Sequence, residues 1–317
     1  HIVSDGWSMS VLFSELSQAY NAFRRGQTPS FAPLPVQYAD YAAWQRERLT
    51  GAALEREVAH WRERLAGAPP LLALPTDRPR PDTSTHRGAW LRVMVPAERV
   101  AALHRLGRDA DCTLFMTLLA AFDIVLGRWA GTHDVVVGTP IAGCGRTELE
   151  GLIGFFVNTL VLRTRLDGNP TFRELLARVR ATALDAYAHP DLPFERLVDE
   201  LQPARDTGRT PLFQVMFNLH NEPVQPAVFD GLEATPIGVD RGFAKFDLTV
   251  SITESAHGLF VHLEYNADLY AQDTIRALAA SFEQVLAVVT ADPEARVNAL
   301  PPTPAVAHPA RDGDRHD

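Results

Sequence analysis

The stretch TLFMTLLAAFDIVLGRWAGTHDVVVGTPIAG (113–143) decides the fold class. Its first part, up to Gly131, is apolar on most sides and therefore predicts a helix buried in the protein interior. Its second part, from His133 onward, is a short run rich in valine that predicts an interior strand. A buried helix followed directly by a buried strand is typical of a mixed α/β protein.

Segments on both sides of this stretch continue the alternation. The pattern predicts strands at 88–96, 154–166, 212–219, 246–253 and 259–266, and helices at 97–111, 169–189, 192–201 and 271–290. Within GFFVNTLVLRTRL (154–166), the residues expected to face the core are Phe155, Val157, Leu160 and Leu162. The chain is therefore expected to adopt a mixed α/β fold.

The first part of the chain has a different character. An amphipathic helix is predicted from Ser8 to Phe23, and two helices rich in Arg and Glu follow at 36–49 and 54–67. The Pro-rich segment 68–88 is expected to be extended. Residues 301–317 are rich in proline and charge, so we expect a disordered tail or linker there.

Composition narrows the class of protein. With 317 residues, 46% of them apolar, the chain can bury a substantial core and is expected to be soluble. A net charge of −9 without a dense Lys/Arg stripe argues against nucleic acid as a partner. We find no apolar run near the roughly 20 residues of a membrane span and no secretion signal. Cys112 and Cys144 lack metal-like spacing and favour a reducing cytoplasm.

The residues that can do chemistry stand in HIVSDGWSMSVLFSEL (1–16). Imidazole titrates near neutral pH, so His1 can act as a base whose position a second group such as Asp5 fixes. Gly6 permits close backbone approach or an unusual dihedral angle. Trp7 is a large apolar residue beside this polar cluster, and Ser8 is placed to cap the following helix.

This stretch resembles the active-site motif of the condensation domains of non-ribosomal peptide synthetases, His-His-x-x-x-Asp-Gly followed by Trp-Ser. His1 matches the second histidine, which the family treats as catalytic, while Asp5 and Gly6 match the aspartate and glycine. Four further segments match family motifs in the family's order: YADYAAWQ (38–45), IGFFVNTLVLR (153–163), HPDLPFERLVDEL (189–201) and RDTGRTPLFQVMFNLHN (205–221).

The resemblance implies a two-lobed fold like chloramphenicol acetyltransferase, with a tunnel between the lobes and His1 at its middle. Residues 1–32 would be the remnant of the N-terminal lobe, and residues 33–300, with the crossover segment 68–88, the C-terminal lobe. Most of the first lobe would be missing, so we expect this exact segment to be poorly soluble or inactive. Residues expected to line the tunnel are Trp7, Ser8 and Asn158.

The implied reaction is amide bond formation between a carrier-bound acyl or peptidyl thioester and a carrier-bound aminoacyl acceptor. Upstream and downstream peptidyl carrier domains would supply the phosphopantetheine arms, with an adenylation domain as a possible neighbour. The domain itself would bind no metal and no cofactor. His1 is either a base or a positioning group. Asp5 either orients His1 or, as the family favours, braces the turn through an arginine.

Several alternatives stay open at this point. An epimerization domain would keep the His-x-x-x-Asp-Gly core, and a catalytically silent module would recruit other proteins. A heterocyclization domain is excluded by His1, and a Ser–His–Asp hydrolase by the lack of a Gly-x-Ser-x-Gly elbow. Structural roles are expected for YADYAAWQ, His189 and His220. GCGRTE (143–148) lacks the glycine and Lys-Ser/Thr pattern of a phosphate-binding loop.

Overall fold

The computed structural model describes residues 2–143, 146–202, 208–220, 228–235, 237, 239 and 241–300. The helices are α1 (Gly6–Arg24), α2 (Tyr38–Arg48), α3 (Gly51–Arg64), α4 (Ala97–Asp109), α5 (Leu114–Ala130), α6 (Phe172–Ala188), α7 (Phe194–Leu201) and α8 (Gln272–Ala291). The strands are β1 (Gly88–Pro96), β2 (Asp134–Ile141), β3 (Asn158–Arg165), β4 (Val215–His220), β5 (Leu248–Ser255) and β6 (Gly258–Asn266). The predicted α/β class is confirmed. The assignment of residues 1–32 and 33–300 to two lobes stays a prediction.

The six strands form one mixed sheet in the order β1-β6-β5-β4-β2-β3. β4 lies between β2 and β5 and runs parallel to both, whereas the other neighbouring pairs are antiparallel. The pairing of β6 with β1 extends over its whole length, from Gly258 to Asn266, and its pairing with β5 ends one residue earlier. This edge of the sheet is therefore a continuous antiparallel ladder, while the centre is parallel.

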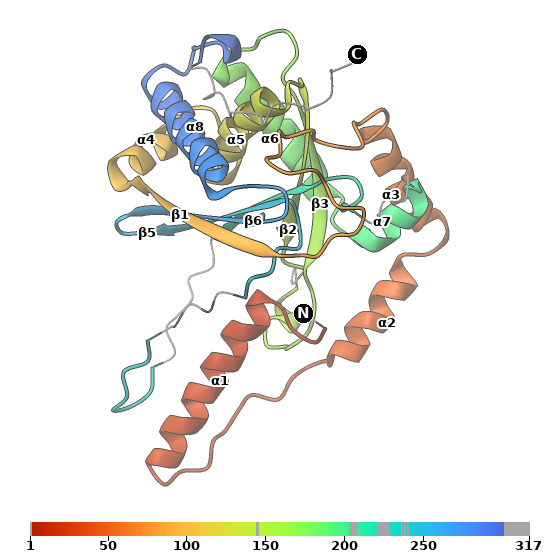
Figure 1. The fold of residues 1–317 in the computed structure, drawn as a ribbon. Helices are drawn as coiled ribbons and strands as arrows, with labels where there is room; N and C mark the ends of the chain where they lie inside the picture. Colours follow the sequence, from red (N-terminus) through yellow and green to blue (C-terminus); the bar gives the residue numbers. More distant parts are fainter. Residues whose placement is uncertain are drawn as a thin grey trace.

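Helices α4, α5, α6 and α8 cover one face of the sheet (Figure 1). α5 is central, and nearly all of its residues are buried, as the apolar pattern predicted. Its ends follow from the sequence: the Thr113 hydroxyl accepts a hydrogen bond from the Met116 N–H, and Gly131 closes the helix in the left-handed conformation. The core of the molecule lies between these helices and the sheet.

α8 corrects one expectation from the sequence. By length and hydropathy, Gln272–Ala291 is long and apolar enough to cross a membrane, although no such run was expected. Half of that apolar window is buried inside the fold, where Ile275, Phe282 and Leu286 belong to the core. A core helix passes the same test of length and composition, so this property alone carries no assignment to a membrane.

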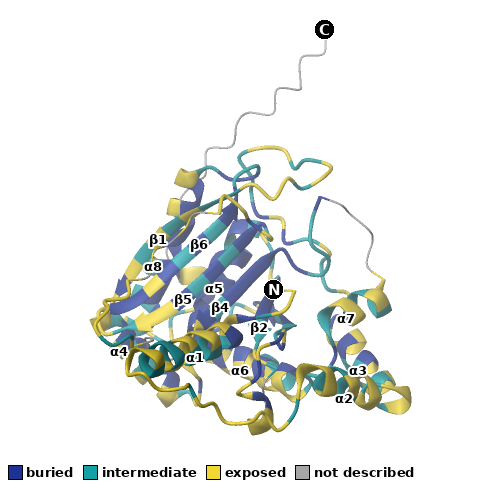
Figure 2. Ribbon diagram, turned by 90° about the horizontal axis from the view of Figure 1, so that it is seen from below, coloured by how far each residue is buried: buried dark blue, intermediate teal, exposed yellow. Residues whose placement is uncertain are grey.

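The opposite face of the sheet is more open (Figure 2). Its alternating residues are exposed or half-buried, and they include the large apolar side chains of Trp90, Met94 and Phe260. Register places Arg92 beside His262 and His262 beside Ser251, so a polar row crosses the strands on this face. One side of the sheet therefore builds the core, and the other remains an accessible surface of the described chain.

α1 lies apart from the sheet (Figure 1). Near its C-terminal end, Asn21 donates a hydrogen bond to the Val228 carbonyl at 2.8 Å, and Arg25 pairs with Asp230 at 2.6 Å. Several of its apolar side chains are exposed, among them Leu16 and Phe23 at 51% and 67%. These contacts hold the C-terminal end of α1, while part of its apolar surface is not covered by the described part of the chain.

Most element boundaries differ from the sequence prediction by one to four residues, and two of these shifts concern the site. β3 begins at Asn158 rather than at Gly154, and α1 begins at Gly6 rather than at Ser8. The predicted alternation also fails at the start of β3, because Phe155 is 38% exposed whereas Phe156 is buried. Leu160 and Leu162 are buried as expected. The polar contacts of residues 154–156, described next, explain both shifts.

Candidate active site

The site predicted from the sequence is a turn that leads into α1. His1 lies outside the described residues, so the structure begins at Ile2. Asp5 is the residue that caps α1: its backbone is extended, and its carboxylate accepts a hydrogen bond from the Ser8 N–H. The expectation that Ser8 caps the helix was therefore wrong. Asp5 takes this position because a carboxylate three residues before a free N–H satisfies it well.

The Asp5 carboxylate is buried and holds three hydrogen bonds. Oδ1 accepts from the Ser8 N–H at 2.9 Å and lies 2.8 Å from the Ser8 hydroxyl. Oδ2 accepts from the N–H of Phe156, 151 residues away in sequence, at 2.9 Å. No arginine pairs with Asp5 among the residues that the structure describes. Within that range, Asp5 braces the turn through backbone and hydroxyl groups, which differs from the expected ion pair.

Ser8 adds a second link to the same distant segment. Its hydroxyl lies 2.7 Å from the Gly154 carbonyl and accepts a hydrogen bond from the Gly154 N–H at 3.0 Å. The Ser8 hydroxyl has a single proton, so it can donate to the Gly154 carbonyl or to the Asp5 carboxylate, but not fully to both. Since the backbone groups of residues 154 and 156 bond to the turn, they are not available for strand pairing, and β3 starts later than predicted.

Gly6 and Trp7 also occupy defined positions. Gly6 is the first residue of α1, and its backbone is not in the left-handed conformation. A Cβ at this position would meet nothing within 4 Å. Neither expected feature, a close backbone approach or an unusual dihedral angle, is found at Gly6 within the described chain, and open space lies beside it. The indole N–H of Trp7 donates to the Glu150 carbonyl at 2.7 Å. Trp7 thereby gives the turn a third link to the loop between β2 and β3.

The other side of segment 154–156 packs against α2. The Tyr38 hydroxyl donates to the Phe155 carbonyl at 2.9 Å, and the Phe156 ring makes contacts with both Tyr38 and Tyr41. A Cβ at Gly154 would lie only 2.2 Å from the Tyr38 ring, so only glycine allows this approach. Segment 154–156 thus separates the turn that holds Asp5 from the aromatic face of α2.

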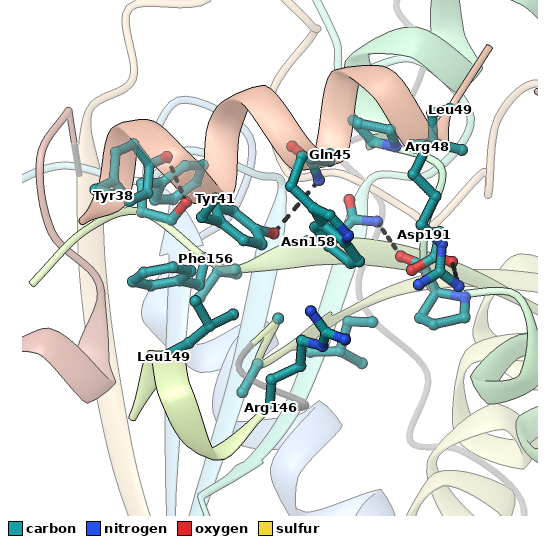
Figure 3. Close-up of a pocket in the computed structure, with 18 of the residues that line it drawn as sticks. Tyr38, Tyr41, Gln45, Arg48, Leu49, Arg146, Leu149, Phe156, Asn158 and Asp191 are labelled. Atoms are coloured by element: carbon teal, nitrogen blue, oxygen red, sulfur yellow. Dashed lines mark hydrogen bonds and ion pairs between the residues drawn. The ribbon is translucent and has the colours of Figure 1, made fainter. Parts of the chain in front are cut away.

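A pocket of about 480 Å³ opens on the α2 side of this segment (Figure 3). Its walls come from α2, the end of β2, the start of β3 and residues 190–195. Two guanidinium groups lie over the Trp44 ring, with the Arg48 Cζ 5.2 Å and the Arg146 Cζ 4.9 Å from its centroid. Arg48 also pairs with Asp191 at 2.9 Å. The pocket therefore combines aromatic walls with two cations.

Among the residues predicted to line a tunnel, Asn158 alone lines this pocket. Its amide is fully used in the fold: Nδ2 donates to the carbonyls of Pro190 and Leu192 at 2.8 Å each. Its Oδ1 accepts from the N–H groups of Thr159 at 2.8 Å and Phe194 at 3.0 Å. Asn158 therefore joins the start of β3 to the loop before α7. Trp7 and Ser8 do not line this pocket and belong instead to the turn that holds Asp5.

The histidines that the sequence assigned to structural roles do have such contacts. His189 ends α6 and lies 3.1 Å from Glu57, and its ring stacks on His60 with 3.6 Å between centroids. His220 lies 3.1 Å from the Asn218 amide at the end of β4. Among the described residues, no group of three His, Cys, Asp or Glu side chains could hold a metal ion.

Sequence reasoning missed the part played by segment 154–156. The predicted helix at YADYAAWQ is present as α2, but it buries no residue fully, and its aromatic side chains line the pocket. Tyr38, Tyr41 and Trp44 recur every three residues, which places them on one helix face. That spacing was the available signal for a surface that faces a cavity rather than a core.

Comparison with known proteins gives a consistent result. The family profile described as "Condensation domain" matches residues 1–306. One of the proteins that make up the linear gramicidin synthase of Brevibacillus parabrevis is 52% identical over 303 residues, which are 95% of this chain and 4% of that protein. The X-domain from teicoplanin biosynthesis has a TM-score of 0.86 at 31% identity, with 94% of this chain and 69% of that one covered.

A further structure agrees in fold. The first condensation domain of the CDA synthetase has a TM-score of 0.73 at 24% identity, and the match covers 95% of this chain and 64% of that one. These likenesses confirm the predicted chloramphenicol acetyltransferase-like fold. The chain spans only a small fraction of the curated relative that it matches, and about two thirds of the solved domains.

Proposed function

Since the chain belongs to the condensation domain family, we propose that it forms amide bonds within a non-ribosomal peptide synthetase. The donor is an acyl or peptidyl thioester on one carrier domain, and the acceptor is an aminoacyl group on another. The observation that supports this proposal is the buried Asp5 carboxylate of the matched motif, which ties the start of α1 to the Phe156 N–H. A catalytic group gains most when its position is set before the substrates arrive.

The chemistry requires little beyond placement and one proton transfer. The acceptor amine attacks the thioester carbonyl carbon, the C–N bond forms, and the C–S bond breaks. The amine nitrogen loses a proton, and the departing sulfur gains one and leaves as a thiol. An α-amine has a pKa of about 8, so neutral His1 at physiological pH can accept or position that proton. General-base assistance of this type contributes about 10²- to 10⁴-fold in rate.

Asp5 acts in this scheme as a positioning residue rather than as a catalytic one. Its two oxygens are occupied by Ser8 and Phe156, so its described contacts fix the turn on both sides. The open space beside Gly6 gives a substrate room to approach the turn. His1 is then the group that touches the reacting atoms.

Partners and location belong to the same proposal. The phosphopantetheine arms come from upstream and downstream carrier domains, with an adenylation domain as a further neighbour, and the domain supplies no cofactor of its own. We place the reaction in the cytoplasm and assign no role to nucleic acid or membranes. The chain spans about two thirds of the solved domains, and α1 exposes apolar side chains, so residues 1–317 alone are proposed to be inactive.

The test uses a longer protein that includes the upstream sequence, together with separately loaded carrier domains. Amide product is measured by mass spectrometry for this protein, for its His1→Ala variant and for residues 1–317 alone. We expect product from the first and a loss of about 100-fold or more for His1→Ala. Undiminished turnover by His1→Ala would contradict the proposed role of the imidazole.

The same assay separates the alternatives. An epimerization domain would exchange the α-proton of a carrier-bound substrate with deuterium from the solvent and form no amide. A recruiting module would give neither product. Full activity of residues 1–317 alone would contradict the proposed need for a further segment, without affecting the role of His1.

A further inference from the structure

The pocket between α2 and the β2–β3 loop is separate from the turn that holds Asp5. Segment 154–156 lies between them: its backbone bonds to Asp5 and Ser8, while the Phe156 ring faces Tyr38 and Tyr41. Neither Asp5 nor Ser8 lines the pocket. A volume of about 480 Å³ lies within the range of small-molecule sites. The proposed reaction assigns this space no role.

The aromatic wall is the first part of a binding site. Tyr38, Tyr41 and Trp44 follow one face of α2, with neighbouring ring centroids 5.9 and 6.0 Å apart. The Phe156 ring closes this wall 4.9 Å from the Tyr41 ring. Phe156 is itself buried in a small apolar cluster that supports the wall, whereas Tyr38, Tyr41 and Trp44 are exposed or half-buried and offer apolar contact area to a ligand.

The polar part of the lining is uneven in charge. Arg48 is neutralised by Asp191, as Figure 3 shows. Arg146 enters the pocket from a separate loop (Figure 3), and its guanidinium group makes no ion pair or hydrogen bond with the described residues. Within the described part of the chain its five N–H donors are unoccupied, and a guanidinium fork matches the geometry of carboxylate and phosphate groups.

Two further side chains that line the pocket, Gln45 and Glu195, affect which ligand charge it favours. The Gln45 amide donates a long hydrogen bond of 3.4 Å to the Tyr41 hydroxyl, and its second N–H can serve as another donor to a ligand. Glu195 also lines the pocket and opposes an anion. Trp44 holds the Arg146 guanidinium by its ring face, which fixes the cation at the aromatic wall. An anionic head at Arg146 and an apolar body on the tyrosines satisfy both features.

We propose that this pocket binds an amphipathic anion, with a carboxylate or phosphate head at Arg146 and an aromatic or aliphatic body against Tyr38 and Tyr41. Its lining does not include the turn that holds Asp5, and the proposal does not depend on the reaction proposed for His1. The pocket gives the domain a second ligand site whose wall, segment 154–156, also anchors the Asp5 turn.

A matched series of probes tests the selectivity. Phenylbutanoate, phenylbutyl phosphate, phenylbutanol and phenylbutylammonium share one apolar body, and isothermal titration measures their binding to residues 1–317. We expect at least one of the two anions to bind about tenfold more tightly than the alcohol, because a charge-assisted hydrogen bond is added, and the ammonium to bind least. The stronger anion identifies the head group. Equal affinity for all four probes, or no binding, overturns the proposal.

Three variants locate the charge effect. Arg146→Gln should lower the affinity for the preferred anion to that of the alcohol, and Glu195→Gln should raise it. Arg92→Gln is the matched control, because Arg92 also lies over a tryptophan, 5.0 Å from the Trp90 ring, but outside the pocket. It should leave all affinities unchanged. An anion preference that survives Arg146→Gln, or that disappears in Arg92→Gln, would overturn the assignment.

A spectroscopic measurement places the probe without relying on affinity. The indole N–H resonance of Trp44 is identified by its loss in Trp44→Phe, and it should shift when the preferred anion is added to the unaltered chain. The Trp90 resonance should stay in place. A shift at Trp90 without one at Trp44 would show that the probe binds elsewhere and would refute the site.

Discussion

Asp123 offers a quantitative test of the core. It lies on α5 with no exposed surface, and neither carboxyl oxygen has a hydrogen-bond partner among the described groups. Burial raises the pKa of Asp123 from 3.8 to about 8, and the neighbouring Thr164 hydroxyl offsets only part of this effect. The folded chain therefore carries this residue as a neutral acid at physiological pH.

The direction of the pH dependence follows from the raised pKa. The unfolded chain ionises Asp123 above pH 3.8, while the folded chain keeps it protonated up to about pH 8. The unfolding free energy should therefore fall as pH rises between these values and become flat above them. Each pH unit in this window costs about 1.4 kcal/mol, so the loss between pH 5 and pH 7 is about 3 kcal/mol from this residue alone.

The measurement compares urea unfolding at pH 5, 6 and 7 for the unaltered chain and for Asp123→Asn. The amide has a similar shape and does not titrate. The unfolding free energy of the variant should therefore decrease by about 3 kcal/mol less between pH 5 and pH 7 than that of the unaltered chain, whatever the variant's stability at any one pH. Asp273→Asn is the control, because the Asp273 side chain is 91% exposed. It should retain the original slope. Equal slopes for Asp123→Asn and the unaltered chain would refute the neutral buried acid.

Three further predictions concern the turn, the loop before α7 and the stacked histidines. Asp5→Ala should lower the unfolding free energy by about 2 kcal/mol, since it removes the helix cap and the bond to Phe156, whereas Asp5→Asn keeps a capping oxygen and should lose less in urea titration. Asn158→Ala leaves buried carbonyl and N–H groups unpaired, so a loss of about 2–3 kcal/mol is expected by the same measurement, and a neutral result would contradict the bonding described. Burial is the largest cause that lowers the pKa of His60 below 6.5, and the nearby His189 is the second. The unfolded chain therefore binds this proton more readily than the folded chain, so the unfolding free energy should be highest above about pH 6.5 and should decrease as pH falls below that value. His60→Phe should reduce that decrease in thermal unfolding at pH 5.5 against pH 7.5, and an unchanged difference would exclude His60 as its source.

Much of the architecture was predictable because it depends on local periodicity. β1 was predicted at its observed bounds, and α5 and α8 within a residue or two, since their apolar patterns extend over many residues. The motif His1 to Ser8 and four further segments in the family's order identified the family, because residue types at fixed spacing can be recognised without any knowledge of tertiary contacts. These features belong to the sequence itself.

The tertiary structure decided what local pattern could not contain. The local cap from Asp5 to the Ser8 N–H starts α1 at Gly6, whereas the bond from the Phe156 N–H, 151 residues away, helps to delay the start of β3. Asn158 was predicted as a tunnel residue, yet its amide saturates four backbone groups of its own chain.

The pocket, too, depends on contacts between segments that are distant in the sequence. Trp44 and Arg146 are about a hundred residues apart, and only folding brings the guanidinium over the ring. Sequence by itself determined the elements, the family and the residues capable of chemistry, because these depend on neighbours along the chain. Which backbone groups a polar side chain such as Asn158 satisfies, and which ring a cation such as Arg146 lies over, was decided by distant segments that meet only in the folded molecule.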